Sequence, residues 1–275
     1  MDELSRLVKV VSKHASKTSP LFNLEDEASL ETKLFHLINS EEVSTDGYAS
    51  QILYGSSELP ASYRMLKSRF KKKLLNHIRF LELPEGKYSV SELFRRECAT
   101  AILDAETLTS VGEIKLADKI LDKVFKKSVE NEIYDYVVRI LELKKSCSHI
   151  LHNKTKFENY TKLLKHYYKV ENAEREAEHI YQEVMLSVYQ KVELRYKLMP
   201  LYAEALERLE TLWNETGSSK VFNYAHILSI SEQELLGNYQ NIFLKIKGAE
   251  ELLKEGKIHK NWFNYRFNNF IIVYA

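Results

Sequence analysis

Glycine and proline are scarce in this chain, and their scarcity constrains the fold more than any other feature of the sequence. The 275 residues include 8 glycines and 4 prolines, whereas average usage of about 7% and about 5% would give roughly 33 of the two together. β-Sandwiches, β-barrels and propellers need turns rich in these residues about every 8–12 positions. The scarcity also leaves out the glycine-rich phosphate loops of many nucleotide enzymes.

Apolar residues recur with the period of a helix along most of the chain. Three examples are the segments 114–125, 173–189 and 239–253. In each, apolar residues repeat at intervals of three and four and therefore share one face of a helix. No stretch shows the sustained two-residue alternation that is typical of a half-buried strand. We therefore predict an all-α fold with no β-sheet.

The few glycines and prolines mark the expected ends of the helices. Turns are expected at four glycines, Gly112, Gly217, Gly237 and Gly256. A further turn is expected at Glu171–Asn172, and Pro200 either starts a helix or kinks a longer one. Gly248 is the one glycine that does not fall at an expected junction. Links of about two to six residues favour antiparallel neighbours, so we expect helical hairpins.

Three of the expected turns share a sequence pattern. In each, Gly or Asn is followed five positions later by a small or apolar residue: Gly112 and Ala117, Asn172 and Ala177, Gly237 and Ile242. Leu164 and Tyr168 precede the second turn at positions of a first helix. The pattern resembles the turn and second helix of a tetratricopeptide repeat (TPR). The resemblance implies antiparallel helical hairpins stacked as a TPR-like α-solenoid; the alternative is a non-repetitive α-bundle.

The resemblance divides the chain into two regions. We predict an N-terminal helical segment at 1–86, which includes a basic helix at 60–82. The TPR-like repeat region is expected to cover 87–275. The low glycine content also argues against a site made of mobile loops, so we expect any binding face to be made from helix surfaces.

Charge and cysteine content narrow the classes of function. The chain has 40 basic and 39 acidic residues and a net charge of +1, so its bulk charge points neither to nucleic acid nor to a membrane surface. Its two cysteines, Cys98 and Cys147, are too few for a disulfide framework and predict a cytoplasmic location. The longest purely apolar run, 270–275, is far shorter than the ~20 residues that span a bilayer, so no membrane span is expected.

The helix at 61–81 is the sharpest local charge feature, with seven Lys and Arg residues and no acidic residue. Its candidate partner-binding residues are Arg64, Lys67, Lys71, Lys72 and Arg79. A helix can present several cations along one line, so this ridge fits an acidic partner or the phosphates of nucleic acid. The alternative is a solvated face that acidic neighbours balance in the fold.

A second candidate surface mixes aromatic and cationic residues at 156–169. Its candidate partner-binding residues are Tyr160, Lys165 and Tyr168. Such a mixture can line the peptide-binding groove of a helical repeat, or it can stack nucleic-acid bases. The alternative is that the aromatic residues lie at helical spacing in the core.

No pattern in the sequence predicts a catalytic or metal centre. The chain contains no G-x-S-x-G, P-loop or G-x-G-x-x-G motif. His149 and His152 share a helix face, but zinc needs three or four ligands. Glu176 and His179 form a single Glu-x-x-His motif, whereas di-iron bundles use two. We therefore expect no catalytic residues, no metal and no cofactor.

Apolar and aromatic residues crowd the last fourteen positions, 262–275. The end helix of a solenoid normally turns a polar face to solvent. A helix predicted over 257–275 therefore packs into the fold, docks another chain by self-association, or continues into a longer natural protein.

These features together favour a non-enzymatic protein–protein interaction module, a scaffold or adaptor whose groove, lined by Tyr and Lys, accepts a peptide or helix. The second hypothesis is a nucleic-acid-associated or regulatory protein that uses the helix at 61–81. The third is an enzyme with a site scattered between helices. A deep polar pocket of ionisable groups, rather than an open groove, would distinguish the enzyme.

Overall fold

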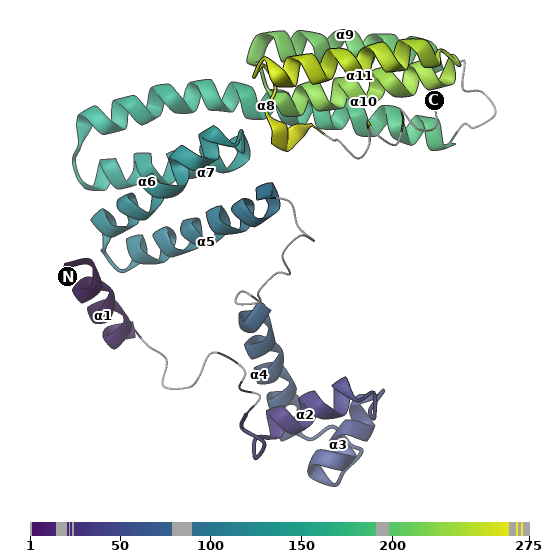
Figure 1. Cartoon of the computed structure of the whole chain (residues 1–275). Coiled ribbons are helices and arrows are strands. Elements are labelled where there is room, and N and C mark those ends of the chain that lie inside the picture. The colour runs from purple at the N-terminus through teal and green to yellow at the C-terminus, as the bar shows by residue number, and fades with distance from the viewer. Residues whose placement is uncertain are drawn as a thin grey trace. The chain divides into compact units, whose positions relative to one another are not determined.

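The computed structural model describes residues 2–14, 21, 23, 25–78, 90–190, 198–263, 268 and 271. Helices dominate these residues, and no strand occurs among them (Figure 1). The predicted all-α class is therefore confirmed. No helix of the described ranges is long and apolar enough to cross a membrane. The chain divides into two compact units, Met1–Tyr88 and Ser89–Ala275.

The first unit contains four helices in its described residues: α1 (Asp2–His14), α2 (Leu30–Asn39), α3 (Asp46–Tyr54) and α4 (Ala61–Ile78). Helices α2, α3 and α4 surround a small core of Leu34, Ala49, Tyr63, Leu66 and Phe70. Thr45 caps α3 by accepting a hydrogen bond from the Tyr48 N–H at 3.3 Å. The basic helix predicted at 60–82 corresponds to α4, and Arg79 lies outside the described residues.

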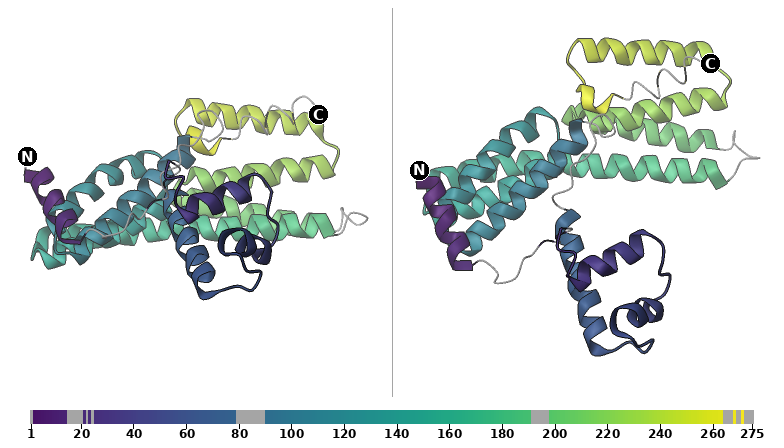
Figure 2. Two further views of the ribbon diagram at one scale, coloured as in Figure 1. Left: turned by 90° about the horizontal axis from the view of Figure 1, so that it is seen from below. Right: turned by 60° about the horizontal axis from the view of Figure 1, so that its bottom comes forward.

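The second unit is a succession of antiparallel helices: α5 (Val90–Ser110), α6 (Ile114–Glu130), α7 (Tyr134–Ile150), α8 (Lys154–Gln190), α9 (Met199–Thr216), α10 (Ser219–Leu235) and α11 (Tyr239–Lys254). A short 3₁₀ helix, Lys260–Trp262, follows. The long helix α8 belongs to two groups, because it packs on α7 and also on α9 and α10 (Figure 2). It thereby joins α5–α7 to α9–α11.

Turns of one kind end most helices of the second unit. In five turns within its described residues, the chain takes a positive φ just after the helix: Gly112, Glu132, His152, Gly237 and Gly256. The next N–H then bonds the carbonyl five positions back, as from Glu113 N to Leu108 O at 2.8 Å, which is the Schellman arrangement. Gly217 ends α9 with a positive φ as well. The four turns predicted at glycines are therefore confirmed.

The first turns repeat at a regular interval that the sequence conceals. Gly112, Glu132 and His152 follow one another at intervals of 20 residues. Two of the three positions are not glycine, and residues other than glycine seldom adopt a positive φ. The residue types of Glu132 and His152 therefore do not mark a turn in the sequence. Each unit of the repeat is thus one helix of about four to five turns and one short link.

The turn predicted at Glu171–Asn172 is wrong, because α8 continues through both residues. Glu171 accepts a hydrogen bond from Arg175 one turn later, at 2.6 Å. Ala173 and Ala177 are buried in a core shared with α9 and α10. This packing outweighs the few tenths of a kcal/mol by which asparagine disfavours a helix. Pro200 lies in the first turn of α9, so the alternative that it starts a helix is confirmed.

The C-terminal segment departs from its predicted form. Helix α11 ends at Lys254 and residues 257–259 are not helical, so a single helix over 257–275 does not form. Four described residues of this segment, Ile258, Phe263, Asn268 and Ile271, are buried in the chain's own fold. Self-association through this segment stays a prediction.

Candidate functional site

The cationic ridge of α4 is partly neutralised within its own unit. Lys67 pairs with Asp46 at 2.6 Å, and Lys73 pairs with Glu31 at 2.7 Å. Arg69 also pairs with Glu31. Burial alone would raise the pKa of Glu31, but hydrogen bonds from Lys73 and Arg69 outweigh it and lower that pKa. Lys67 is therefore committed to a partner inside the unit.

Three predicted residues of α4 remain available to a partner. Arg64, Lys71 and Lys72 are exposed, and none of them forms an ion pair with another described residue. They are accompanied on the surface by Met65 and Leu75, which are 70% and 55% exposed. The ridge is thus shorter than predicted and has apolar neighbours.

The three residues predicted at 156–169 do not form one surface. Tyr160 is only 8% exposed and packs against Val137, Leu141 and their neighbours, so it is a core residue. Lys165 and Tyr168 are exposed. The Tyr168 O–H donates a hydrogen bond to Glu142 at 2.6 Å, and this bond raises the pKa of Tyr168 to about 12. The predicted groove lining therefore reduces to an exposed lysine and a tyrosine bound to its neighbour.

Tyr160 lies beneath a buried lysine that the sequence patterns do not single out. Lys144 of α7 is 1% exposed, and its Nζ lies 5.1 Å from the centre of the Tyr160 ring. It donates hydrogen bonds to Asp118 at 2.8 Å and Asp122 at 2.5 Å, both on α6. Lys156 of α8 reaches Asp118 at 2.9 Å. This network ties three helices together by charge.

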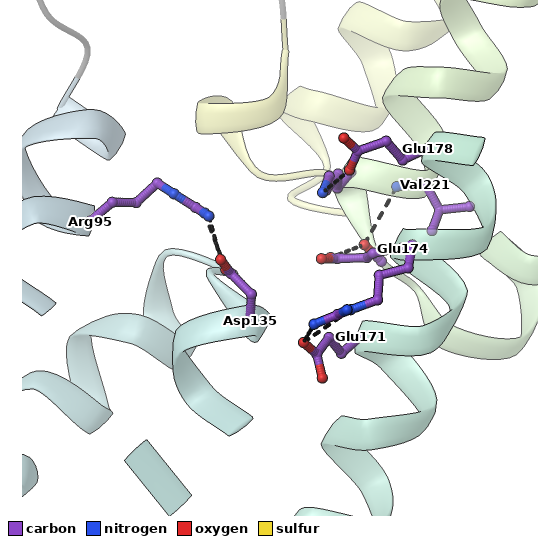
Figure 3. A network of polar contacts seen from close by, with 9 residues as sticks. Arg95, Asp135, Glu171, Glu174, Glu178 and Val221 are labelled. Carbon is purple, nitrogen blue, oxygen red and sulfur yellow. Dashed lines mark hydrogen bonds and ion pairs between the residues drawn. The ribbon is translucent and has the colours of Figure 1, made fainter. Parts of the chain in front are cut away.

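A second polar network joins the two groups of helices (Figure 3). Glu174 of α8 is 4% exposed and accepts a hydrogen bond from the Ser218 hydroxyl at 2.6 Å. Ser218 is also the N-cap of α10. From the α6–α7 turn, Glu132 accepts a hydrogen bond from the Ser219 N–H at 3.1 Å. This polar junction fixes the start of α10 against both α8 and the α6–α7 turn.

Several carboxylates lie close together at the polar junction, and the pKa of one of them, Glu174, is raised. Figure 3 shows Glu171, Glu174 and Glu178 extending from α8, with Asp135 of α7 on the other side. Lys220 pairs with Glu178 at 2.9 Å. Burial, with the added charges of Asp135 and Glu132, raises the pKa of Glu174 to about 7 despite the Ser218 hydrogen bond and the charge of Lys220. Within the described ranges, no cluster of three or more such groups could hold a metal ion.

An open cleft of about 530 Å³ lies between α9, α10 and α11. Its walls are mostly apolar and include Leu206, Trp213, Phe222, Ala225, Ala249 and Leu252. Glu210 of α9 and Lys245 of α11 line it with opposite charges, and neither makes an ion pair with another residue that the structure describes. The volume falls within the range of about 300–1,000 Å³ that is common for ligand sites.

Gly248 lines this cleft. It is the only glycine in the interior of a helix among the described residues, and such a glycine costs about 1 kcal/mol relative to alanine. A Cβ at this position would meet no atom within 4 Å. Close packing against a neighbour therefore does not account for the missing side chain, which instead leaves space in the wall of the cleft.

His226 lies at the floor of the cleft and is held in place. Its ring stacks on Phe222 with the centroids 5.7 Å apart. Its Nε2 lies 3.1 Å from the Oδ1 of Asn268; because an amide oxygen only accepts, the histidine donates. Burial lowers the pKa of His226, and the charge of Lys245 lowers it further. The ring is therefore a fixed, neutral part of the floor.

Comparison with family models, with curated proteins and with solved structures gives no match to this chain. The residues that line the cleft come from three helices, and their sequence positions span more than 40 residues. Of these residues, only Gly248 carries a signal in the sequence, as the glycine that lies away from every expected turn.

Proposed function

We propose that this protein is a non-enzymatic protein interaction module. In this proposal the helices of 89–275 form a TPR-like stack in which one helix and its turn repeat about every 20 residues. The cleft between α9, α10 and α11 accepts a helical segment of a partner protein. The observation that carries the proposal is the open, mostly apolar cleft of about 530 Å³, with the helix-interior glycine Gly248 in its wall.

The chemistry of the cleft supports binding over catalysis. Its walls are mainly apolar, which suits the apolar face of an amphipathic helix. A catalytic site needs ionisable groups that converge on a reacting atom. Here Glu210 and Lys245 lie on different helices with no ion pair between them, and the neutral His226 is bound to Asn268. The exposed residues Lys165 and Tyr168 lie on α8, outside this cleft.

A peptide selection with cleft variants tests the proposal. Helix-forming 16-residue peptides are displayed as a library and selected on the full 275-residue chain, and affinities of the selected peptides are then measured by fluorescence anisotropy. Gly248→Trp fills the cleft and should weaken binding by at least tenfold. Gly248→Ala adds only a methyl group in open space and should bind within about twofold of the wild type. Selected peptides that bind Gly248→Trp as well as wild type would overturn the proposal.

The exposed cations of α4 favour a second candidate function, the binding of nucleic acid or another polyanion. Arg64, Lys71 and Lys72 are free of ion pairs with other described residues. Binding to heparin should then weaken as salt rises, and Lys71→Glu with Lys72→Glu should reduce the salt slope by about two. The same double reversal at Lys123 and Lys126 of α6 is the control. Equal retention of both double variants would count against this function.

A further inference from the structure

The cleft between α9, α10 and α11 has two chemically different ends. At one end the rings of Trp213 and Phe222 lie 5.0 Å apart, and Leu252 packs against the same cluster. At the other end the lining residues include Ser229 of α10 and Lys245 of α11. One end therefore offers an aromatic and aliphatic surface, and the other offers a hydroxyl group and a cation.

The distance between the two ends follows from the helices themselves. Phe222 and Ser229 are seven residues apart on α10, and Lys245 and Leu252 are seven residues apart on α11. Because the two helices are antiparallel, Ser229 lies near Lys245 and Phe222 lies near Leu252. At 1.5 Å per residue, the ends are about 10 Å apart. A bound helix spans that distance in two turns, so its residues i and i+7 reach opposite ends.

The charges in the cleft lack partners within the described structure. Lys245 and Glu210 are each without an ion pair to any described residue, and they lie on the opposite walls formed by α11 and α9. Lys245 as a residue is half-buried, and an acidic group that pairs with it at the edge of the apolar cleft gains more than a fully exposed pair does. An acidic group beside Glu210 would be repelled, and a basic group there would be favoured.

We infer that the cleft selects a partner helix in which a bulky apolar residue and an acidic residue lie seven positions apart. This inference rests on the proposed function and specifies the chemistry of its partner. The apolar residue packs against Trp213, Phe222 and Leu252. The acidic residue pairs with Lys245, and a basic residue on the opposite flank of the partner helix pairs with Glu210.

Selection of peptides on charge variants tests this inference. The same library of helix-forming 16-residue peptides is selected in parallel on the wild-type chain, on Lys245→Glu and on Lys254→Glu. Lys254 is exposed at the end of α11, outside the cleft, so its reversal changes the net charge equally. Among the peptides selected on the wild type and on Lys254→Glu, we expect Asp or Glu seven positions from a bulky apolar residue. Among the peptides selected on Lys245→Glu, we expect Lys or Arg at that peptide position.

Affinities of the selected peptides separate this inference from the proposed function. A wild-type-selected peptide should bind Lys245→Glu about tenfold more weakly and Lys254→Glu within about twofold. Peptides that Gly248→Trp blocks but that show no acidic preference and no loss on Lys245→Glu would overturn the inference and leave the proposed function standing. Failure to obtain any peptide that Gly248→Trp blocks would overturn both.

Discussion

Two lysines of the second unit differ in whether other residues of the chain neutralise their charge. Lys144 of α7 is 1% exposed, and two aspartates of α6 neutralise it. Lys245 of α11 is partly buried beside an apolar cleft, and no described carboxylate pairs with it. Both side chains face neighbouring helices, but only Lys144 has its charge satisfied within the chain.

The difference shows how the same helical architecture produces a structural element in one place and a binding surface in another. Around α6–α8, Lys144 and Lys156 share Asp118, so the charges hold the helices together. Around α9–α11 an apolar cleft stays open with Gly248 in its wall, and the charges beside it are available to a partner. Stability and binding are therefore expected to respond to different substitutions.

The largest expected effect comes from the buried lysine. Lys144→Met removes the buried cation that Asp118 and Asp122 share and leaves the mostly buried Asp118 with Lys156 alone. It should lower the free energy of unfolding by about 3 kcal/mol. Lys245→Met should change it by no more than about 0.5 kcal/mol, because the side chain has no ion pair to lose. Urea denaturation of both variants measures the difference. Equal losses in the two variants would contradict the contrast.

The next largest effect concerns the polar junction and depends on pH. The pKa of Glu174 is raised from 4.5 to about 7 in the folded state, so the folded chain binds more protons than the unfolded chain between these values. The free energy of unfolding should therefore fall as the pH rises from about 4.5 to about 7, and level off above.

Glu174→Gln isolates this contribution. The amide oxygen can still accept the Ser218 hydrogen bond, and the buried charge is gone. Relative to wild type, the variant should be more stable at pH 8 by about 3 kcal/mol, with the advantage shrinking toward pH 5. Thermal or urea unfolding at several pH values measures it. An advantage that does not change with pH would show that ionisation of Glu174 is not its cause.

Gly248→Ala should raise the free energy of unfolding, a change smaller than that of Lys144→Met and opposite in sign. Alanine is favoured over glycine inside a helix by about 1 kcal/mol, and the added methyl group meets no atom within 4 Å. The variant should therefore be more stable by about 1 kcal/mol in urea denaturation. A loss of stability would indicate that the position is packed and does not face the open cleft.

The smallest expected effect lies at a turn. His152 holds a φ of 53°, a conformation that costs a side chain about 1 kcal/mol and costs glycine little. His152→Gly should raise the free energy of unfolding by about 0.5 kcal/mol, while His149→Gly, inside α7, should lower it by about 1 kcal/mol. Measuring both by denaturation checks the assignment of the turn.

Much of the fold follows from the sequence, because its helices have clear apolar stripes and four of its turns carry glycine. The failed prediction of a turn at Glu171–Asn172 has a physical cause, since tertiary packing decides between local alternatives. Asn172 permits a turn, but α8 continues because Ala173 and Ala177 pack on α9 and α10. The turns after α6 and α7 carry no glycine, and Schellman hydrogen bonds compensate the strain of the positive φ at Glu132 and His152.

The candidate site was harder to predict than the fold. Tyr160 has the same helical spacing whether it faces a groove or the core, and only its packing against Val137 and Leu141 in the folded chain places it in the core. The cleft is made by residues of three helices that meet only after folding. Within it, Gly248 is visible in the sequence as a glycine without a turn, but its neighbours Trp213 and Phe222 are not.

Hydrogen–deuterium exchange of the full chain, with and without a peptide selected on the wild type, tests the central claim most directly. If the cleft is the binding surface, the peptide should slow exchange at 206–213, 222–229 and 245–252, the cleft-lining stretches of α9, α10 and α11. Exchange in α4 and at 160–168 of α8 should stay unchanged. Protection confined to α4 or to 160–168 would contradict the claim and place the binding surface elsewhere.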